Sequence, residues 1–144
     1  MNEKINYKLI AILTIVTAII CMGCVETKEP RDSQWISSCS IRIGMVSEDI
    51  NELQKDLASG NYKRFVESAT YLQEDAQIAY DTSIRYTVSP EYETLKTEYE
   101  LAMLDYIQVG TYSIEGDYDT ASKYIESGNQ HMDQVNDLLD QLNN

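Results

Sequence analysis

The sequence is poor in the residues that most catalytic and cofactor sites require, with one histidine, His131, and three cysteines. One histidine cannot supply the two Glu-x-x-His pairs of a di-metal site in a helical bundle. It flanks the predicted core, where it cannot complete a Ser-His-Asp triad. The sequence has no Cys-x-x-Cys-His run and no glycine-rich phosphate loop. We therefore expect no catalytic residue, no metal and no cofactor, interpret His131 as a surface histidine, and predict that the chain is not an enzyme.

Positive charge is also scarce, because 11 Lys and Arg residues stand against 24 Asp and Glu residues, giving a net charge of −13. A surface of this kind repels phosphates and anionic lipid headgroups. The composition therefore argues against a nucleic-acid partner and against a protein that lies flat on a membrane.

Only one long run of the sequence lacks charge, the fifteen residues from Leu9 to Gly23, which follow Lys4 and Lys8. A helix of this length rises roughly 22 Å, short of the ~30 Å hydrocarbon core of a bilayer. The run is therefore predicted to be the core of a signal peptide. The alternative is an uncleaved, short transmembrane helix, and both interpretations place the rest of the chain outside the cytoplasm.

The end of this run, Ile20-Cys21-Met22-Gly23-Cys24, resembles the lipobox of prokaryotic lipoproteins. Gly23 and Cys24 match its two most restrictive positions, whereas Cys21 stands where a leucine or similar aliphatic residue is usual. The resemblance implies that Cys24 carries a lipid and becomes the first residue. The chain would then be anchored to the cell membrane on the extracytoplasmic side. The resemblance covers residues 1–24 and implies a location only.

We divide the chain into a signal segment (1–23), a polar tether that contains Pro30 (24–32) and a helical domain (33–144). In the helical domain, apolar residues recur with alternating steps of three and four, which predicts amphipathic helices. Four such stripes run from Ile36 to Leu57, from Phe65 to Tyr86, from Tyr92 to Ser113 and from Ala121 to Leu142. No stretch alternates with period two, so no strand is expected.

Two glycines, Gly60 and Gly116, separate these stripes where helix ends are expected. Glycine readily adopts the left-handed conformation that closes a helix. Asn61 and Asp117 follow directly, and their side chains can accept hydrogen bonds from the free amides that open the next helix. The sequence therefore predicts two tight helix–helix turns.

Ser89, before Pro90, is expected to cap the third helix, and Asp32 or Ser33 the first. The sequence thus predicts an all-α fold with helices at about 33–59, 61–88, 90–115 and 117–143. Short turns force antiparallel neighbours, so we predict an up-down-up-down four-helix bundle. The third and fourth stripes repeat the first and second after 56 residues. This spacing leaves open whether the two hairpins are a duplication or only share one geometry.

Tyrosine is unusually common, with eleven residues against one Phe and one Trp. Tyr99 and Tyr106 recur, with Tyr92, every seven residues on the inner face of the third predicted helix. They either fill the core opposite the alanines of the second helix or line a groove for a small molecule or peptide. Tyr80 and Tyr124 fall off the stripes, where exposed tyrosines are typical of contact surfaces. Tyr99, Tyr106, Tyr80 and Tyr124 are thus the candidate ligand or contact residues.

Cys39 occupies a core position of the first stripe and is interpreted as a buried thiol. Together these features favour a membrane-tethered extracytoplasmic module with a non-enzymatic role, in protein interaction or envelope structure, whose protein partner is unknown. The alternative is a sensor-like bundle that binds a small molecule or peptide, resembling the periplasmic domains of chemoreceptors. A cavity lined by Tyr99 and Tyr106 would favour the alternative, and a solid core would favour the module.

Overall fold

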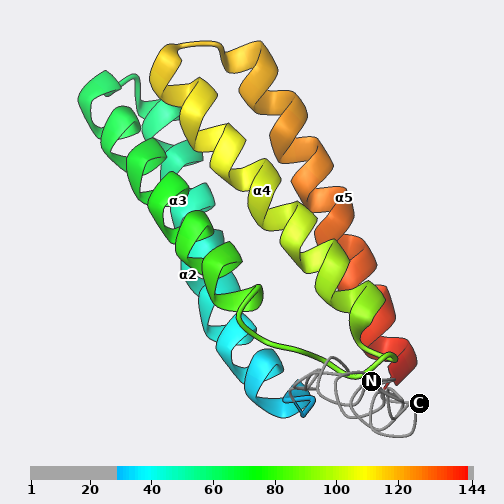
Figure 1. Cartoon of the computed structure of the whole chain (residues 1–144). Coiled ribbons are helices and arrows are strands. Elements are labelled where there is room, and N and C mark those ends of the chain that lie inside the picture. Colours follow the sequence, from blue (N-terminus) through cyan, green and yellow to red (C-terminus); the bar gives the residue numbers. More distant parts are fainter. Residues whose placement is uncertain (1–28, 143–144) are drawn as a thin grey trace, which may run out of the picture.

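The computed structural model describes residues 29–142, which form four α-helices and no strand (Figure 1). The helices are α2 (Asp32–Ser59), α3 (Tyr62–Ser83), α4 (Glu93–Glu115) and α5 (Tyr118–Leu142). The all-α prediction is confirmed. The predicted signal segment and Cys24 lie outside the described residues. None of the four described helices combines the length and the apolar character that a membrane crossing requires.

The helices pack in chain order, α2 against α3, α3 against α4 and α4 against α5. Consecutive helices run antiparallel. The two tight turns therefore lie at one end of the bundle, and the α3–α4 connection lies at the other (Figure 1). This arrangement confirms the prediction of an up-down-up-down bundle.

Both tight turns have the predicted chemistry. Gly60 and Gly116 adopt left-handed backbone, with φ of 69° and 81°. The Asn61 side chain accepts a hydrogen bond from the Arg64 N–H at 3.2 Å, and the Asp117 side chain accepts one from the Thr120 N–H at 3.1 Å. Each turn thus closes one helix and caps the next.

The connection between α3 and α4 differs from the prediction. α3 ends at Ser83 instead of residue 88, and α4 begins at Glu93 instead of residue 90. Ser89 does not cap α4, because its N–H donates to Asp32 Oδ1 at 2.7 Å and its hydroxyl has no hydrogen-bond partner. With Asp32 bonded in this way, α2 starts after Arg31 without a side-chain cap.

Core packing explains the early end of α3. Pro90 disfavours helical backbone only in Ser89, which lies six residues beyond the end of α3. Val88 is buried, so the chain leaves the helix and places this side chain in the core. The Arg31 N–H also donates to the Thr87 carbonyl oxygen at 3.0 Å, which ties the connection to the start of α2.

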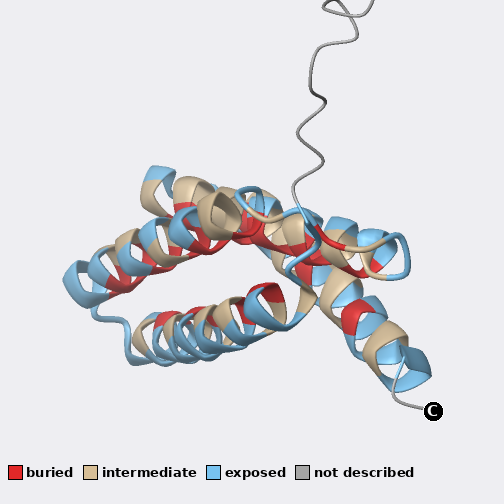
Figure 2. Cartoon of the chain, turned by 60° about the horizontal axis from the view of Figure 1, so that its bottom comes forward, coloured by how far each residue is buried: buried red, intermediate tan, exposed pale blue. Residues whose placement is uncertain are grey.

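The core is built mainly by α3 and α4. Buried residues lie on the inward sides of the helices, and exposed residues lie on the outward sides (Figure 2). α4 alone buries Tyr99, Met103 and Tyr106 among eight residues, whereas α5 buries only Ala121, Gly128 and Val135. Trp35 and Met103 are buried although neither belongs to a predicted stripe. Burial therefore declines from the two middle helices toward α2 and α5.

The sides of α2 and α5 that face each other are packed less closely than the sequential helix pairs. No Cα atom of α2 lies within 8 Å of one in α5. The expected core residues on these sides pack against the core but are only half-buried. We call this strip the α2–α5 seam; it consists of Ile36, Ile43, Ile50, Ile125, Met132 and Leu139.

Candidate functional site

Tyr99 lies on the inner face of α4 and is fully buried, with an exposed fraction of 0%. Its ring meets Trp35 of α2 edge to face, with ring centroids 6.1 Å apart. The hydroxyl has no hydrogen-bond partner. Burial, together with the nearby Cys39 thiol, raises the pKa of Tyr99 well above its ordinary value. Tyr99 is thus a core residue whose ring spans from α4 to α2.

Tyr106, one heptad further along α4, is also in the core, with an exposed fraction of 4%. Its hydroxyl donates to Asn129 Oδ1 of α5 at 2.9 Å, and burial raises its pKa to about 12. The ring lies over Gly128, where an added Cβ would come within 2.8 Å of Tyr106 Cε1. Gly128 therefore leaves the room that the Tyr106 ring occupies.

A hollow beside Tyr99 is small and apolar. It lies between α2, α4 and α5, is bordered by Ile43, Leu95, Tyr99 and Val135, and has a volume of about 30 Å³. That is room for about one water molecule, whereas ligand pockets usually measure about 300–1,000 Å³. Tyr106 does not line this hollow. The two tyrosines therefore fill the core and do not form a groove.

A chain of polar groups crosses the core next to Tyr99. Trp35 Nε1 donates to Ser83 Oγ at 2.9 Å, and the Ser83 hydroxyl donates to Glu100 Oε1 at 2.8 Å. Lys96 Nζ lies 2.7 Å from the same carboxylate oxygen. These bonds join α2, α3 and α4, and each of these polar groups has a partner, which is what a stable core requires.

Cys39 lies beside this chain and is buried, as predicted. Burial raises the pKa of the thiol to about 11. The thiolate is the reactive form of cysteine, so a thiol with this pKa stays protonated and unreactive at neutral pH. Cys39 is therefore a packing residue.

Tyr80 and Tyr124 are half-buried and pack against the core. The Tyr124 ring stacks on Tyr112 of α4, with centroids 5.6 Å apart and planes 7° from parallel. Tyr80 lies on α3 and Tyr124 on α5, two helices that are not neighbours in the bundle. The four candidate tyrosines therefore do not form one surface.

His131 is less exposed than expected for a surface histidine. Its Nδ1 lies 2.6 Å from Glu98 Oε2, and its Nε2 lies 3.9 Å from Asp105 Oδ2, so the ring sits between two carboxylates of α4. The sequence does contain a signal for this contact. His131 follows Gly116 by fifteen residues, and Glu98 and Asp105 lie on either side of the position fifteen residues before Gly116. Equal distances from a tight turn bring residues of two antiparallel helices to the same height.

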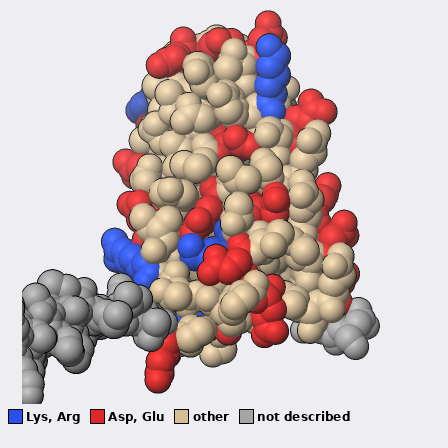
Figure 3. Space-filling model, turned by 45° about the vertical axis from the view of Figure 1, so that its right-hand side comes forward, with Lys and Arg blue, Asp and Glu red and all other residues tan. Residues whose placement is uncertain are grey.

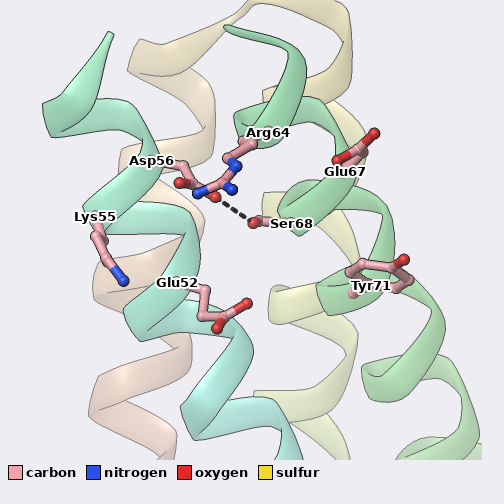
Figure 4. A pocket seen from close by; sticks show the side chains of 7 residues that line it. All are labelled: Glu52, Lys55, Asp56, Arg64, Glu67, Ser68 and Tyr71. Atoms are coloured by element: carbon pink, nitrogen blue, oxygen red, sulfur yellow. Dashed lines mark hydrogen bonds between the residues drawn. The ribbon is translucent and has the colours of Figure 1, made fainter. Parts of the chain in front are cut away.

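A larger hollow, of about 280 Å³, lies between α2 and α3 near the Gly60 turn (Figure 4). Two residues that line this hollow are hydrogen-bonded, with the Ser68 hydroxyl donating to Asp56 Oδ2 at 2.8 Å. The remaining lining is mostly charged, with side chains of both signs around an open, solvated surface: Glu52, Lys55, Arg64, Glu67 and Tyr71. Because the charges are mixed, the hollow presents no single charge that would select a ligand.

Asp49, on the side of α2 that faces α3, has an unfavourable environment. Its Oδ2 is buried without a hydrogen-bond partner. Burial raises the pKa of the carboxyl to about 6, and the carboxyl group of Asp75 on α3 adds to the rise. The pKa of this carboxyl is lower in the unfolded chain, so the unfolded chain loses the proton at a lower pH than the folded chain. The charged form of Asp49 therefore destabilises the fold above pH 6.

Asp49→Asn should raise the free energy of unfolding at pH 7.5 by about 1 kcal/mol, a value reduced for partial exposure to solvent. The gain should shrink toward zero as the pH falls from 6 to 4, because Asp49 then becomes neutral in the folded chain. Urea melts across this pH range measure the effect. Asp137→Asn, at an exposed position of α5, is the control for removing one negative charge. An equal gain from both variants at pH 7.5 would contradict the prediction.

Three acidic residues, Glu115, Asp117 and Asp119, lie at the Gly116 turn, and Asp117 caps α5. Asp117 accepts the hydrogen bond from Thr120, and this bond lowers the pKa of its carboxyl. Within residues 29–142, no group of three or more His, Cys, Asp and Glu side chains is arranged to hold a metal ion.

Comparison of the chain with protein-family models, with curated proteins and with solved structures finds no match.

Proposed function

We propose that this chain is a lipid-tethered, extracytoplasmic helical module that acts by contact with other proteins and not by catalysis. The observation that carries the proposal is the burial of Tyr99 and Tyr106 in the core. A sensor-like bundle would need a pocket at these residues, and the hollow beside Tyr99 measures only about 30 Å³. A domain with a filled core offers its outer surface to other molecules.

The direction of the tether supports a module that stands away from the membrane. The described chain enters α2 at the end of the bundle opposite the Gly60 and Gly116 turns (Figure 1). A lipid on Cys24 would hold that end near the bilayer and leave the turn end outermost. Acidic side chains are spread over the face shown in Figure 3, and basic ones are few. Anionic headgroups would repel such a surface, which favours an upright domain.

The turn end carries exposed aromatic and aliphatic side chains. Leu57, Tyr62 and Tyr118 are exposed there, Tyr62 with a fraction of 61%. They surround a hollow of about 200 Å³ next to Phe65, whose ring meets Tyr118 edge to face at 5.5 Å. Aromatic residues are enriched in protein interfaces, because they bring a large contact area with little loss of side-chain freedom.

Replacing Cys24 by Ser tests the tether. When the full chain is produced in a prokaryotic host, we expect the parent protein to start at Cys24 and to carry the mass of a lipid. The variant should lack that mass and keep its signal segment. Mass spectrometry of the N-terminal peptide measures both, and protease added to spheroplasts should digest the parent. A parent protein that still starts at Met1 and stays in the membrane would show that the anchor is an uncleaved helix.

A further inference from the structure

The α2–α5 seam is apolar along its length, and its edges carry no charge. Positions four residues after a seam residue lie on the same side of the helix, turned about 40° further toward solvent. On both helices these positions are exposed and hold small or neutral polar residues. They are Ser40, Ser47 and Gln54 on α2, and Asn129 and Asn136 on α5.

The opposite edges of the same helices behave differently. On α2 that edge carries Asp49 and Asp56, which face Asp75 and Ser68 of α3. On α5 it carries His131, which meets Glu98 of α4. The outward faces of both helices are acidic, with Glu48 and Glu52 on α2, and Glu126, Asp133 and Asp137 on α5. Among the described residues, the uncharged edges are therefore those that face no other helix, apart from Asn129, which accepts the hydrogen bond from Tyr106 of α4.

The uncharged edges of the seam differ from the rest of the molecule, which is rich in charged residues. A quarter of all residues are charged, 24%, and the net charge is −13. Interfaces between proteins are depleted of charged residues at their centre and are surrounded by a polar rim. A site for a basic partner protein should have acidic side chains along its edges. The edges of the seam have none, which argues against such a partner.

We propose that the α2–α5 seam is the contact between two copies of this chain. Two copies repel each other through most of their acidic surface, and the seam lets them meet without opposed carboxylates. A two-fold axis parallel to the bundle would place α2 of one copy against α5 of the other. Ser47 precedes Gly60 by thirteen residues and Asn129 follows Gly116 by thirteen, so the two uncharged edges match in height.

The size of the seam fits a weak contact. Its residues span fourteen residue steps on each helix, from Ile36 to Ile50 and from Ile125 to Leu139. The seam is therefore about 21 Å long and, at about 10 Å for each helix, about 20 Å wide. This gives roughly 400 Å² for each copy, the size of a transient contact that depends on a high local concentration. The inference rests on the proposed function in one respect, because lipid anchors would hold both copies upright and at high local concentration.

Photo-crosslinking of the full chain in membranes tests the pairing. A photoreactive amino acid at Ser47 should give a product of twice the mass of the chain, and the same group at Ser37, on the outward face of α2, should give little. The double variant Ser40→Glu/Asn136→Glu places charges on both edges and should lower the yield from Ser47 at least about tenfold, since like charges across an interface cost several kcal/mol. Ser37→Glu/Gln130→Glu adds the same charges at exposed positions outside the seam and should leave the yield unchanged.

Three outcomes would overturn the inference. Equal dimer yields from Ser47 and Ser37 would indicate random collision. A product with residues 9–23 of the same chain would show that the chain covers its own seam. A product with a different protein would show that the seam has another partner, and the proposed function would then still stand. A parent chain that carries no lipid mass and still gives the dimer through Ser47 would contradict the tether and not the seam.

Discussion

Tyr99→Ala is expected to lower the free energy of unfolding by about 3–5 kcal/mol, the usual range for removing a large aromatic side chain from a core. Tyr99 is fully buried and bridges α4 to Trp35 of α2. Its removal would enlarge the 30 Å³ hollow that already lies beside it. The hollow is bordered by Ile36, Ile43 and Leu139 of the seam, so the enlarged gap would lie between α2, α4 and α5.

Tyr99→Phe separates packing from hydrogen bonding at the same position. The Tyr99 hydroxyl is buried without a hydrogen-bond partner. Removing it should be neutral or slightly stabilising, because an unsatisfied buried polar group costs about 1–3 kcal/mol. Denaturant melts of both variants give the comparison. If Tyr99→Ala were as stable as the parent, the residue would line an open site, and the ligand-binding alternative would replace the module.

The helices and tight turns could be predicted from the sequence because their causes are local. Glycine followed by an oxygen-bearing side chain at Gly60-Asn61 and Gly116-Asp117 specifies the end of one helix and the cap of the next. The α3–α4 connection could not be predicted in this way. Ser89 has the local features of a cap, but its N–H pairs with Asp32, fifty-seven residues away, and Val88 needs a place in the core.

The candidate site was predicted less well than the fold, for a similar reason. A heptad pattern shows which residues share one side of a helix, but it contains no information on the distance between two helices. Ile43 and Val46 belong to one stripe, yet Val46 is buried and Ile43 is half-buried, because α2 and α5 stay apart. Tyr124 was expected to be exposed, and its stacking on Tyr112 depends on how α4 and α5 align.

Gly110→Ala is expected to destabilise the protein by about 2 kcal/mol, although alanine is the better helix former. Gly110 is buried in α4, where that helix lies close against α3. A Cβ at this position would lie 2.6 Å from Gln73 Cβ and 2.7 Å from the Ala69 carbonyl oxygen. The carbonyl belongs to the backbone of α3 and cannot rotate away, so the two helices would have to separate. The hydrogen bond from Gln73 Nε2 to Thr111 Oγ1, 2.8 Å long, would be stretched in the process.

Gly44→Ala is the matched control, since it makes the same chemical change within α2. A Cβ at Gly44 would meet no heavy atom within 4 Å. Only the helix propensity then changes, and the variant should gain up to about 1 kcal/mol. Urea melts of the two variants should therefore shift in opposite directions. A gain at both positions would mean that α3 and α4 lie further apart than the contacts of Gly110 require.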